Sequence, residues 1–325
     1  MENHDEQSRI AASYPFEESG TGYGDSGGPT LLNGVAIAVV SIGDVPCWST
    51  QVNPRTDTEE AADFLRPYLA LTHSGRTGRE RKLLPPVFDH VTIRVADIAA
   101  SRRFYSLALG EPTHDVEVVT AWGDFDITSA SVEKPPPKRL HIGFGAHDRD
   151  EVDRWWEELT AAGYESDGIP GVRPWYHPSY YGAFVLDPDG NSIEYVHHHK
   201  TTPEASRIDH LWLRTRDVDG AKRFYETIAP VVGIELVLDT PDRVRFSDGV
   251  GSFSFVQEDE PTENVHYAFG VGDRAAVDEF HRVAISAGYR DNGAPGERPQ
   301  YHPGYYGAFV LDPDGHNVEA VFHDR

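Results

Sequence analysis

The chain is poor in cysteine and in basic side chains. Among its 325 residues it has one cysteine, Cys47, and 29 Lys and Arg against 53 Asp and Glu. One cysteine excludes an intrachain disulfide bond and a zinc site built from cysteines. The formal net charge of −24 repels phosphate groups, so we expect neither nucleic acid nor a membrane as a partner.

Long apolar runs are also lacking, and the first residues have neither an apolar run nor a basic segment. The sequence therefore predicts no membrane span, no signal peptide and a cytoplasmic location. The length predicts two or three domains.

A long stretch of sequence occurs twice. Tyr176–Glu194 returns almost letter for letter as Tyr301–Glu319. A repeat of this length indicates two homologous domains in tandem. We divide the chain into a disordered tail (1–20), an N-terminal fragment (21–72), a linker (73–86) and two repeated domains (87–200 and 206–325).

The N-terminal fragment contains Gly-Asp-Ser-Gly-Gly-Pro at Gly24–Pro29. This resembles the nucleophile motif of trypsin-like serine proteases, and the resemblance continues to Leu69. It implies Ser26 as the nucleophile. Such a serine needs a histidine base and a carboxylate, which lie upstream in that family. His4 is the only histidine before Ser26 in this sequence, so we interpret the fragment as a truncated, vestigial remnant.

Hydrophobic patterns in the repeated domains predict strands and helices in a fixed order. Phe88–Val95 alternates, with Val91, Ile93 and Val95 on one face. Asp97 is a plausible N-cap for a helix that ends at Gly110.

The same order restarts later in each repeat, where a helix is followed by a long loop and a hairpin. The turn Asp187–Gly190 reads Asp-Pro-Asp-Gly, in which proline fixes one φ angle and glycine allows a positive one. Each domain therefore reads βαβββ twice.

Both repeats resemble vicinal oxygen chelate domains, the superfamily of glyoxalase I, extradiol dioxygenases and bleomycin-resistance proteins. The resemblance rests on residues Asp89–Val91, Arg103–Tyr105, Leu140–Ile142, Asp187–Asn191 and Glu194, and on their counterparts Asp209–Leu211, Arg223–Tyr225, Val265–Tyr267, Asp312–His316 and Glu319. It implies an α+β fold in which the paired βαβββ modules of each domain form an open barrel around a divalent metal.

The resemblance also implies one metal-ligand set in each domain. The expected ligands are His90, His141 and Glu194 in the first domain and His210, His266 and Glu319 in the second. Two imidazoles and a carboxylate suit Fe²⁺, Mn²⁺, Zn²⁺ or Ni²⁺ and leave open positions for a substrate. Alternation supports this reading, because His141 shares its strand face with small residues, Gly143 and Gly145.

Glyoxalase I has a second carboxylate ligand on the fourth strand of its site. Here Asp126 or Asp124 is a loose candidate in the first domain, and the corresponding strand of the second domain, Ser252–Phe255, has no carboxylate. The sequence therefore favours three ligands over four.

The loop before each hairpin borders the substrate in this superfamily. We predict acid–base or hydrogen-bonding roles for His177, Tyr181, His302 and Tyr306. Arg173 and Arg298 are candidates to hold an anionic substrate. The alternative is that these side chains only pack a rigid loop.

The leading hypothesis is a metal-dependent isomerase, lyase or dioxygenase that acts on a small oxygenated molecule. A metal-independent protein that binds or sequesters a small molecule such as a drug is the alternative, and a serine-type peptidase is a remote one. Two tandem domains can pair with each other, so a monomer and a homodimer both remain open.

Overall fold

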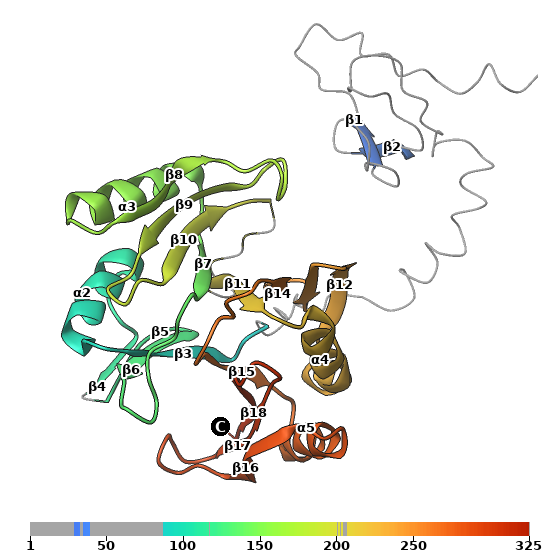
Figure 1. Cartoon of the computed structure of the whole chain (residues 1–325). Helices are drawn as coiled ribbons and strands as arrows, with labels where there is room; N and C mark the ends of the chain where they lie inside the picture. Colours follow the sequence, from blue (N-terminus) through green and yellow to red (C-terminus); the bar gives the residue numbers. More distant parts are fainter. Residues whose placement is uncertain are drawn as a thin grey trace, which may run out of the picture. The chain divides into compact units, whose positions relative to one another are not determined.

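The computed structural model describes residues 29–32, 35–39, 87–116, 118–199, 201, 203 and 207–324. The chain divides into two compact units, Met1–Lys82 and Leu83–Arg325. In the first unit, β1 (Pro29–Leu32) and β2 (Val35–Val39) form an antiparallel pair (Figure 1). The predictions for the tail, for Ser26 and for the linker lie outside the described residues.

The second unit consists of four βαβββ modules, two in each repeat, as predicted. The first module contains β3 (His90–Val95), α2 (Ile98–Leu109), β4 (His114–Val116), β5 (Val119–Trp122) and β6 (Phe125–Ser129). The second contains β7 (His141–Gly145), α3 (Arg149–Ala161), β8 (Ser166–Val172), β9 (Tyr181–Leu186) and β10 (Ser192–His197).

The second repeat has the same order. Its first module contains β11 (Ile208–Thr215), α4 (Val218–Val232), β12 (Glu235–Thr240), β13 (Arg243–Ser247) and β14 (Ser252–Gln257). Its second contains β15 (His266–Gly270), α5 (Arg274–Ser286), β16 (Arg290–Glu297), β17 (Tyr305–Leu311) and β18 (Asn317–His323).

An aspartate caps the N-terminus of each helix from α2 to α5. Asp97 accepts hydrogen bonds from the backbone N–H groups of Ala99 and Ala100, which confirms the predicted cap, and Gly110 ends α2. The prediction of a long loop before each hairpin is wrong, because β8 and β16 occupy part of it. These strands are bulged and rich in glycine and proline, a composition that hides strands in a sequence.

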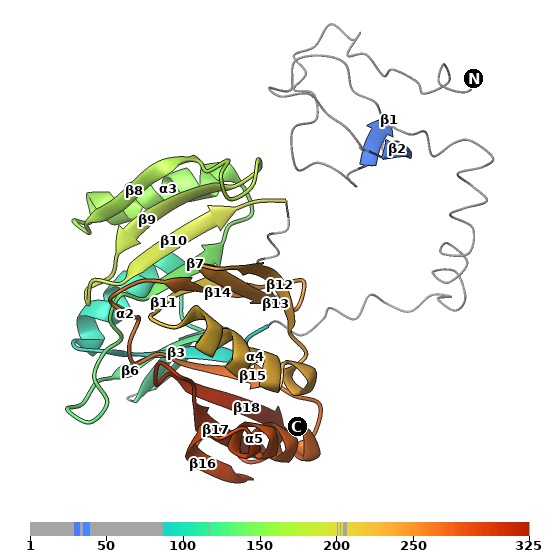
Figure 2. The same ribbon diagram turned by 45° about the vertical axis from the view of Figure 1, so that its right-hand side comes forward.

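Each eight-stranded sheet is shared between the repeats. One sheet has the order β12-β13-β14-β11-β7-β10-β9-β8, and the other has β16-β17-β18-β15-β3-β6-β5-β4. The prediction of open α+β sheets of βαβββ modules is confirmed, but the prediction that the two modules of one repeat form one barrel is wrong. The second module of each repeat instead pairs with the first module of the other (Figures 1 and 2).

Strand direction explains why this exchange needs only a short connection. β10 is parallel to β7, and β11 is antiparallel to β7. β10 and β11 therefore run in opposite directions on either side of β7, and the chain between His197 and Ile208 can join them directly.

The helices hold each repeat together. α2 packs beside α3, and α4 packs beside α5, while the buried apolar residues of both repeats form one continuous core. A buried hydrogen bond crosses this core, because the hydroxyl of Tyr105 on α2 donates to Asp187 Oδ2 in the hairpin turn (2.8 Å). Tyr225 on α4 donates in the same way to Asp312 (2.9 Å). The repeated Asp-Pro-Asp-Gly turn therefore anchors a helix as well as reversing the chain.

Replacing Tyr105 by Phe should lower the free energy of unfolding by about 2 kcal/mol, because the buried Asp187 carboxylate loses a donor. Tyr225→Phe is the matched variant and should cost less. The reason is that Asp312 has a second tyrosine beside it. The hydroxyl of Tyr267 contacts that of Tyr225 and also lies next to Asp312. Urea unfolding followed by circular dichroism measures both, and an equal loss in the two variants would contradict the difference.

Candidate functional site

The six predicted ligand residues converge in two clusters. One, the His90 site, contains His90, His266 and Glu319; the other, the His210 site, contains His141, Glu194 and His210. The prediction of one set in each domain is wrong. Because β11 pairs with β7 and β3 pairs with β15, each site combines a histidine from one repeat with a histidine and a glutamate from the other.

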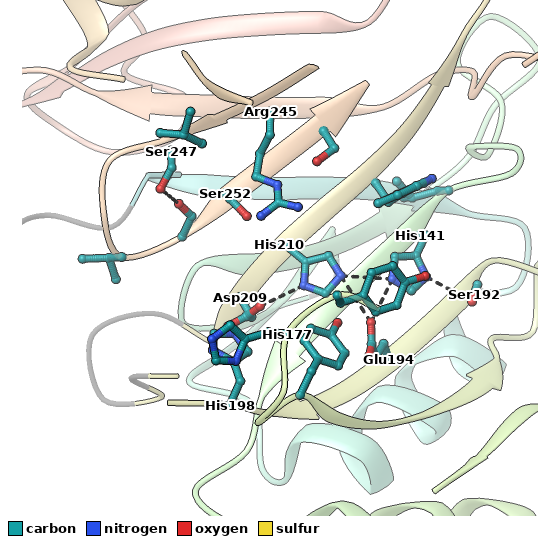
Figure 3. Close-up of a pocket in the computed structure, with 18 of the residues that line it drawn as sticks. His141, His177, Ser192, Glu194, His198, Asp209, His210, Arg245, Ser247 and Ser252 are labelled. Atoms are coloured by element: carbon teal, nitrogen blue, oxygen red, sulfur yellow. Dashed lines mark hydrogen bonds and ion pairs between the residues drawn. The ribbon is translucent and has the colours of Figure 1, made fainter. Parts of the chain in front are cut away.

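The His210 site is the more compact of the two. His141 Nε2 lies 3.1 Å from Glu194 Oε2, and His210 Nε2 lies 3.2 Å from the same oxygen (Figure 3). The two Nε2 atoms are 3.2 Å apart. Glu194 is buried, with 1% of its surface exposed.

The His90 site has the same donor set in a wider arrangement. His266 Nε2 lies 3.3 Å from Glu319 Oε2 and 3.3 Å from His90 Nε2. His90 Nε2 lies 3.7 Å from Glu319 Oε2.

One small residue accounts for part of this difference. The His210 ring lies over Gly143, where a Cβ atom would be 2.2 Å from His210 Cε1. In the other sheet Ala268 occupies the position opposite His90, and its methyl group excludes the same ring placement. The sequence places the small residue Gly143 on the strand face of His141, and in the structure the space above it is filled by a histidine from the other repeat.

Aspartates next to the first-strand histidines fix their rings. His210 Nδ1 donates to Asp209 Oδ1 (2.8 Å), and Asp209 Oδ2 contacts His198 Nε2 (2.9 Å). Asp89 holds His90 Nδ1 (2.8 Å) and His323 Nε2 (3.0 Å) in the same way. Because Nδ1 is the donor in these bonds, Nε2 is the ring atom directed to the centre of the cluster.

Charge around the histidines shifts their proton affinity. Burial alone would lower the pKa of His210, but hydrogen bonds to Asp209 and Glu194 raise it to about 10. In the His90 site burial would likewise lower the pKa of His90. The hydrogen bond to Asp89 and the charge of Glu319 instead raise this pKa to about 9. Burial would raise the pKa of Asp209, yet its bonds to His198 and His210 hold it far below its ordinary value.

These atoms fit a divalent cation. Two imidazole nitrogens and a carboxylate oxygen meet, and a metal ion that displaces the proton of His210 would have all three as ligands. For a metal with bonds of about 2.1 Å, neighbouring ligand atoms lie about 3.0 Å apart in an octahedron and about 3.4 Å apart in a tetrahedron. The separations of 3.1, 3.2 and 3.2 Å in the His210 site lie between these values.

The second oxygen of each glutamate faces a tyrosine and a glycine. Tyr305 donates to Glu319 Oε1 (2.7 Å). Its counterpart Tyr180 lines the cavity at the His210 site, where burial and the charge of Glu194 raise its pKa. Gly182 is required beside Glu194, because a Cβ atom there would lie 2.3 Å from Oε1. Sequence reasoning missed these tyrosines and this glycine.

The predictions for Tyr181 and Tyr306 are wrong by one residue. Tyr181 donates to Asp153 on α3 (2.7 Å), and Tyr306 donates to Asp278 on α5 (2.8 Å). Both therefore lie on the face that the helices cover. Alternation along a strand places the preceding tyrosine, Tyr180 or Tyr305, on the opposite face, where the ligand residues lie.

Arg173 and Arg298 brace their own loops. Arg173 donates to the carbonyl oxygen of Ile169 (2.8 Å) and stacks on Phe184. Arg298 donates to that of Ala294 (2.7 Å) and stacks on Phe309. Arg173 does not line the cavity described next. These contacts with their own loops favour the packing alternative over substrate binding for both arginines.

The two loop histidines lie in different surroundings. His177 is exposed at the cavity rim, where its Nδ1 contacts Ser179 Oγ (2.8 Å). His302 Nε2 contacts His323 Nδ1 (2.9 Å) and so joins the chain of contacts that leads through Asp89 to His90. Their acid–base roles stay predictions.

The His210 site opens into a cavity of about 1000 Å³. Its walls include Tyr176, Phe184 and Trp212 as well as the three ligand residues. Asp126 belongs to the other site: it pairs with Thr92 on the neighbouring strand, and its charge acts on His90. Asp124 instead accepts a hydrogen bond from the backbone N–H of Arg207 (3.2 Å).

The model of the Glyoxalase/Bleomycin resistance protein/Dioxygenase superfamily matches residues 87–195 and 207–320. The chain therefore belongs to this superfamily, with one match in each repeat. The match begins at residue 87, so the resemblance of 21–72 to serine proteases stays a prediction. No helix in the described part of the chain is long and apolar enough to cross a membrane.

Solved structures share the fold. Glyoxalase I from Zea mays has a TM-score of 0.55 at 21% identity, over 73% of this chain and 92% of that chain. A putative dioxygenase from Bacillus subtilis has a TM-score of 0.53 at 13% identity, over 74% and 86%. At these identities the likeness establishes the fold alone. A search of curated proteins finds no match.

Replacing Gly143 by Ala should weaken the binding of Zn²⁺ or Co²⁺ at the His210 site at least tenfold, about 1.4 kcal/mol, because the new methyl group displaces the His210 ring. Isothermal titration with the metal measures this. Ala268→Gly, at the opposing position of the His90 site, is the control and should change affinity little. Unchanged binding in Gly143→Ala would contradict the packing argument.

Metal affinity at the His210 site should rise with pH. Because the pKa of His210 is raised from 6.5 to about 10, the metal-free protein keeps this proton at neutral pH, and a metal ion must displace it. Affinity should therefore increase about tenfold per pH unit for one displaced proton and level off near the raised pKa. Titrations in buffers of different ionisation enthalpy count the protons, and release of none would contradict this account.

Proposed function

We propose that the chain is a metal-dependent enzyme that acts on a small molecule with two neighbouring oxygens, as an isomerase, lyase or dioxygenase, and that the His210 site is where it acts. The observation that carries the proposal is the set of three potential ligand atoms within 3.2 Å of one another at a cavity of about 1000 Å³. A site that only stabilised the fold would not need an open cavity beside it.

His141, Glu194 and His210 would hold the ion, which would supply a Lewis acid and leave open positions for substrate oxygens. Asp209 and Ser192 orient the two imidazoles, since they contact the Nδ1 atoms of His210 (2.8 Å) and His141 (3.1 Å). Tyr180 faces the same space with a protonated hydroxyl, because burial raises its pKa. It is placed to donate a hydrogen bond to a substrate oxygen.

His177 at the rim remains the candidate acid or base, since its ring lines the cavity. The donor set is compatible with Fe²⁺, Mn²⁺, Zn²⁺ or Ni²⁺ and does not select among them. The alternative, a metal-independent protein that sequesters a small molecule, would use the same cavity without an ion.

Metal content after chelation and reconstitution tests the proposal. The wild-type protein should bind one ion at each site. Glu194→Gln and Glu319→Gln should each remove one, because the amide takes away the charged ligand while keeping its shape. Glu157→Gln, on the exposed surface of α3, is the control for loss of one negative charge.

Unchanged metal content in Glu194→Gln would contradict the proposed site. If small molecules still bound to protein without metal, the sequestering alternative would replace it. Oxygen uptake during turnover would separate a dioxygenase from an isomerase or lyase.

A further inference from the structure

The walls of the two sites carry different charges. In the sheet of the His210 site, Arg245 on β13 pairs with Ser254 on β14. In the other sheet, Ala121 on β5 pairs with Asp126 on β6. These pairs occupy corresponding positions, since β6 and β14 each run parallel to the strand that carries the first histidine. The His210 site thus has the guanidinium of Arg245 where the His90 site has Ala121. The His90 site has the carboxylate of Asp126 where the His210 site has Ser254.

Arg245 faces the ligand cluster. It lines the cavity, and Figure 3 shows its side chain directed toward His210. Val244 and Phe246, on either side of it in β13, are buried on the opposite, helix-covered face. No described residue forms a hydrogen bond or ion pair with its guanidinium group.

A half-buried, unpaired guanidinium favours an anionic partner. Its planar fork matches a carboxylate, and such a pair is stronger when water is partly excluded. Two acids that line the cavity form hydrogen bonds of their own, although Asp248 Oδ2 has no partner among the described residues. Asp209 holds His198 and His210, and Asp248 Oδ1 accepts from the backbone N–H groups of Val250 and Gly251.

The His90 site has the opposite character. Asp126 accepts from Thr92 (3.3 Å), and burial raises its pKa while the charges of His90 and His266 act to lower it. This wall adds a negative charge where the His210 site adds a positive one. An anionic ligand is therefore favoured at the His210 site and disfavoured at the His90 site.

We propose that Arg245 anchors the substrate of the His210 site, and that this substrate carries a carboxylate or a similar anionic group next to its metal-binding oxygens. The inference rests on the proposed function and narrows it to anionic oxygen compounds. It also implies that the Arg245–Ser254 and Ala121–Asp126 pairs determine which of the two sites binds an anionic ligand.

Oxalate, which has adjacent oxygens and two negative charges, is a suitable probe. Glu319→Gln protein, with the His90 site disabled, is loaded with Co²⁺ and titrated with oxalate while the visible absorption of the ion is followed. Adding Arg245→Ala should weaken oxalate binding roughly ten- to a hundredfold. Arg245→Lys should restore part of it, because lysine keeps the charge and loses the fork.

Two controls isolate the role of the guanidinium. Arg154→Ala removes one exposed positive charge from α3 and should leave oxalate binding unchanged. Binding of imidazole, a neutral ligand, should be the same with and without Arg245. If oxalate bound equally well with Arg245 and with Arg245→Ala, and imidazole binding were intact, the proposed role of Arg245 as the anion anchor would be overturned.

The exchange of charges gives an independent test. In a Glu194→Gln background, Asp126→Ser with Ala121→Arg should give the His90 site an affinity for oxalate that it otherwise lacks. No gain in a variant that still binds Co²⁺ would count against the assignment.

Failure of the proposed function is separable from failure of this inference. If no ion binds at the His210 site, the metal-dependent function is wrong. Calorimetric titration of oxalate into the metal-free protein still tests the role of Arg245. An anchoring guanidinium should strengthen oxalate binding, and Arg245→Ala should weaken it.

Discussion

The pairing of β7 with β11, and of β15 with β3, is the constraint on which the sites depend. The register of these pairs sets His210 opposite Gly143 and His90 opposite Ala268. Without this pairing, the strand that carries the first histidine of each site would not belong to the sheet that carries its glutamate. The buried tyrosine–aspartate bonds act within each repeat and keep its helices against the hairpin turn. Sheets join the repeats, and helices hold each one together.

The residue types of the sites could be predicted from sequence, but their grouping could not. His90 and His210 both lie near the start of a first strand, and either could face Glu194, because the two repeats are alike along the strands that meet. Tyr180 was missed because a shift of one residue at the start of β9 exchanges the two faces. Arg245 gave no signal, since an arginine alternating with Val244 and Phe246 reads as a solvent-facing residue of an ordinary strand.

The two repeats agree most closely where the carboxylate is delivered and differ in the strands that face it. Tyr176–Glu194 and Tyr301–Glu319 each supply a tyrosine, a glycine and a glutamate to one site, although only Tyr305 donates a hydrogen bond to its glutamate. The differences, Gly143 against Ala268 and Arg245 against Ala121, adjust the position of a histidine and the charge of a wall. The hairpin thus provides the common chemistry, and the strands beside it, β7 and β15 in the second modules and β5 and β13 in the first, set what each site accepts.

The shared sheets make this chain equivalent to a symmetric dimer whose two subunits have been joined end to end. In a dimer of identical subunits, any substitution appears in both sites, so a change that improves one alters the other equally. Joining the subunits removes this coupling, because Arg245 and Ala121 are separate positions in one chain. Each site can then acquire its own ligand preference while both continue to rely on the same two sheets for their shape.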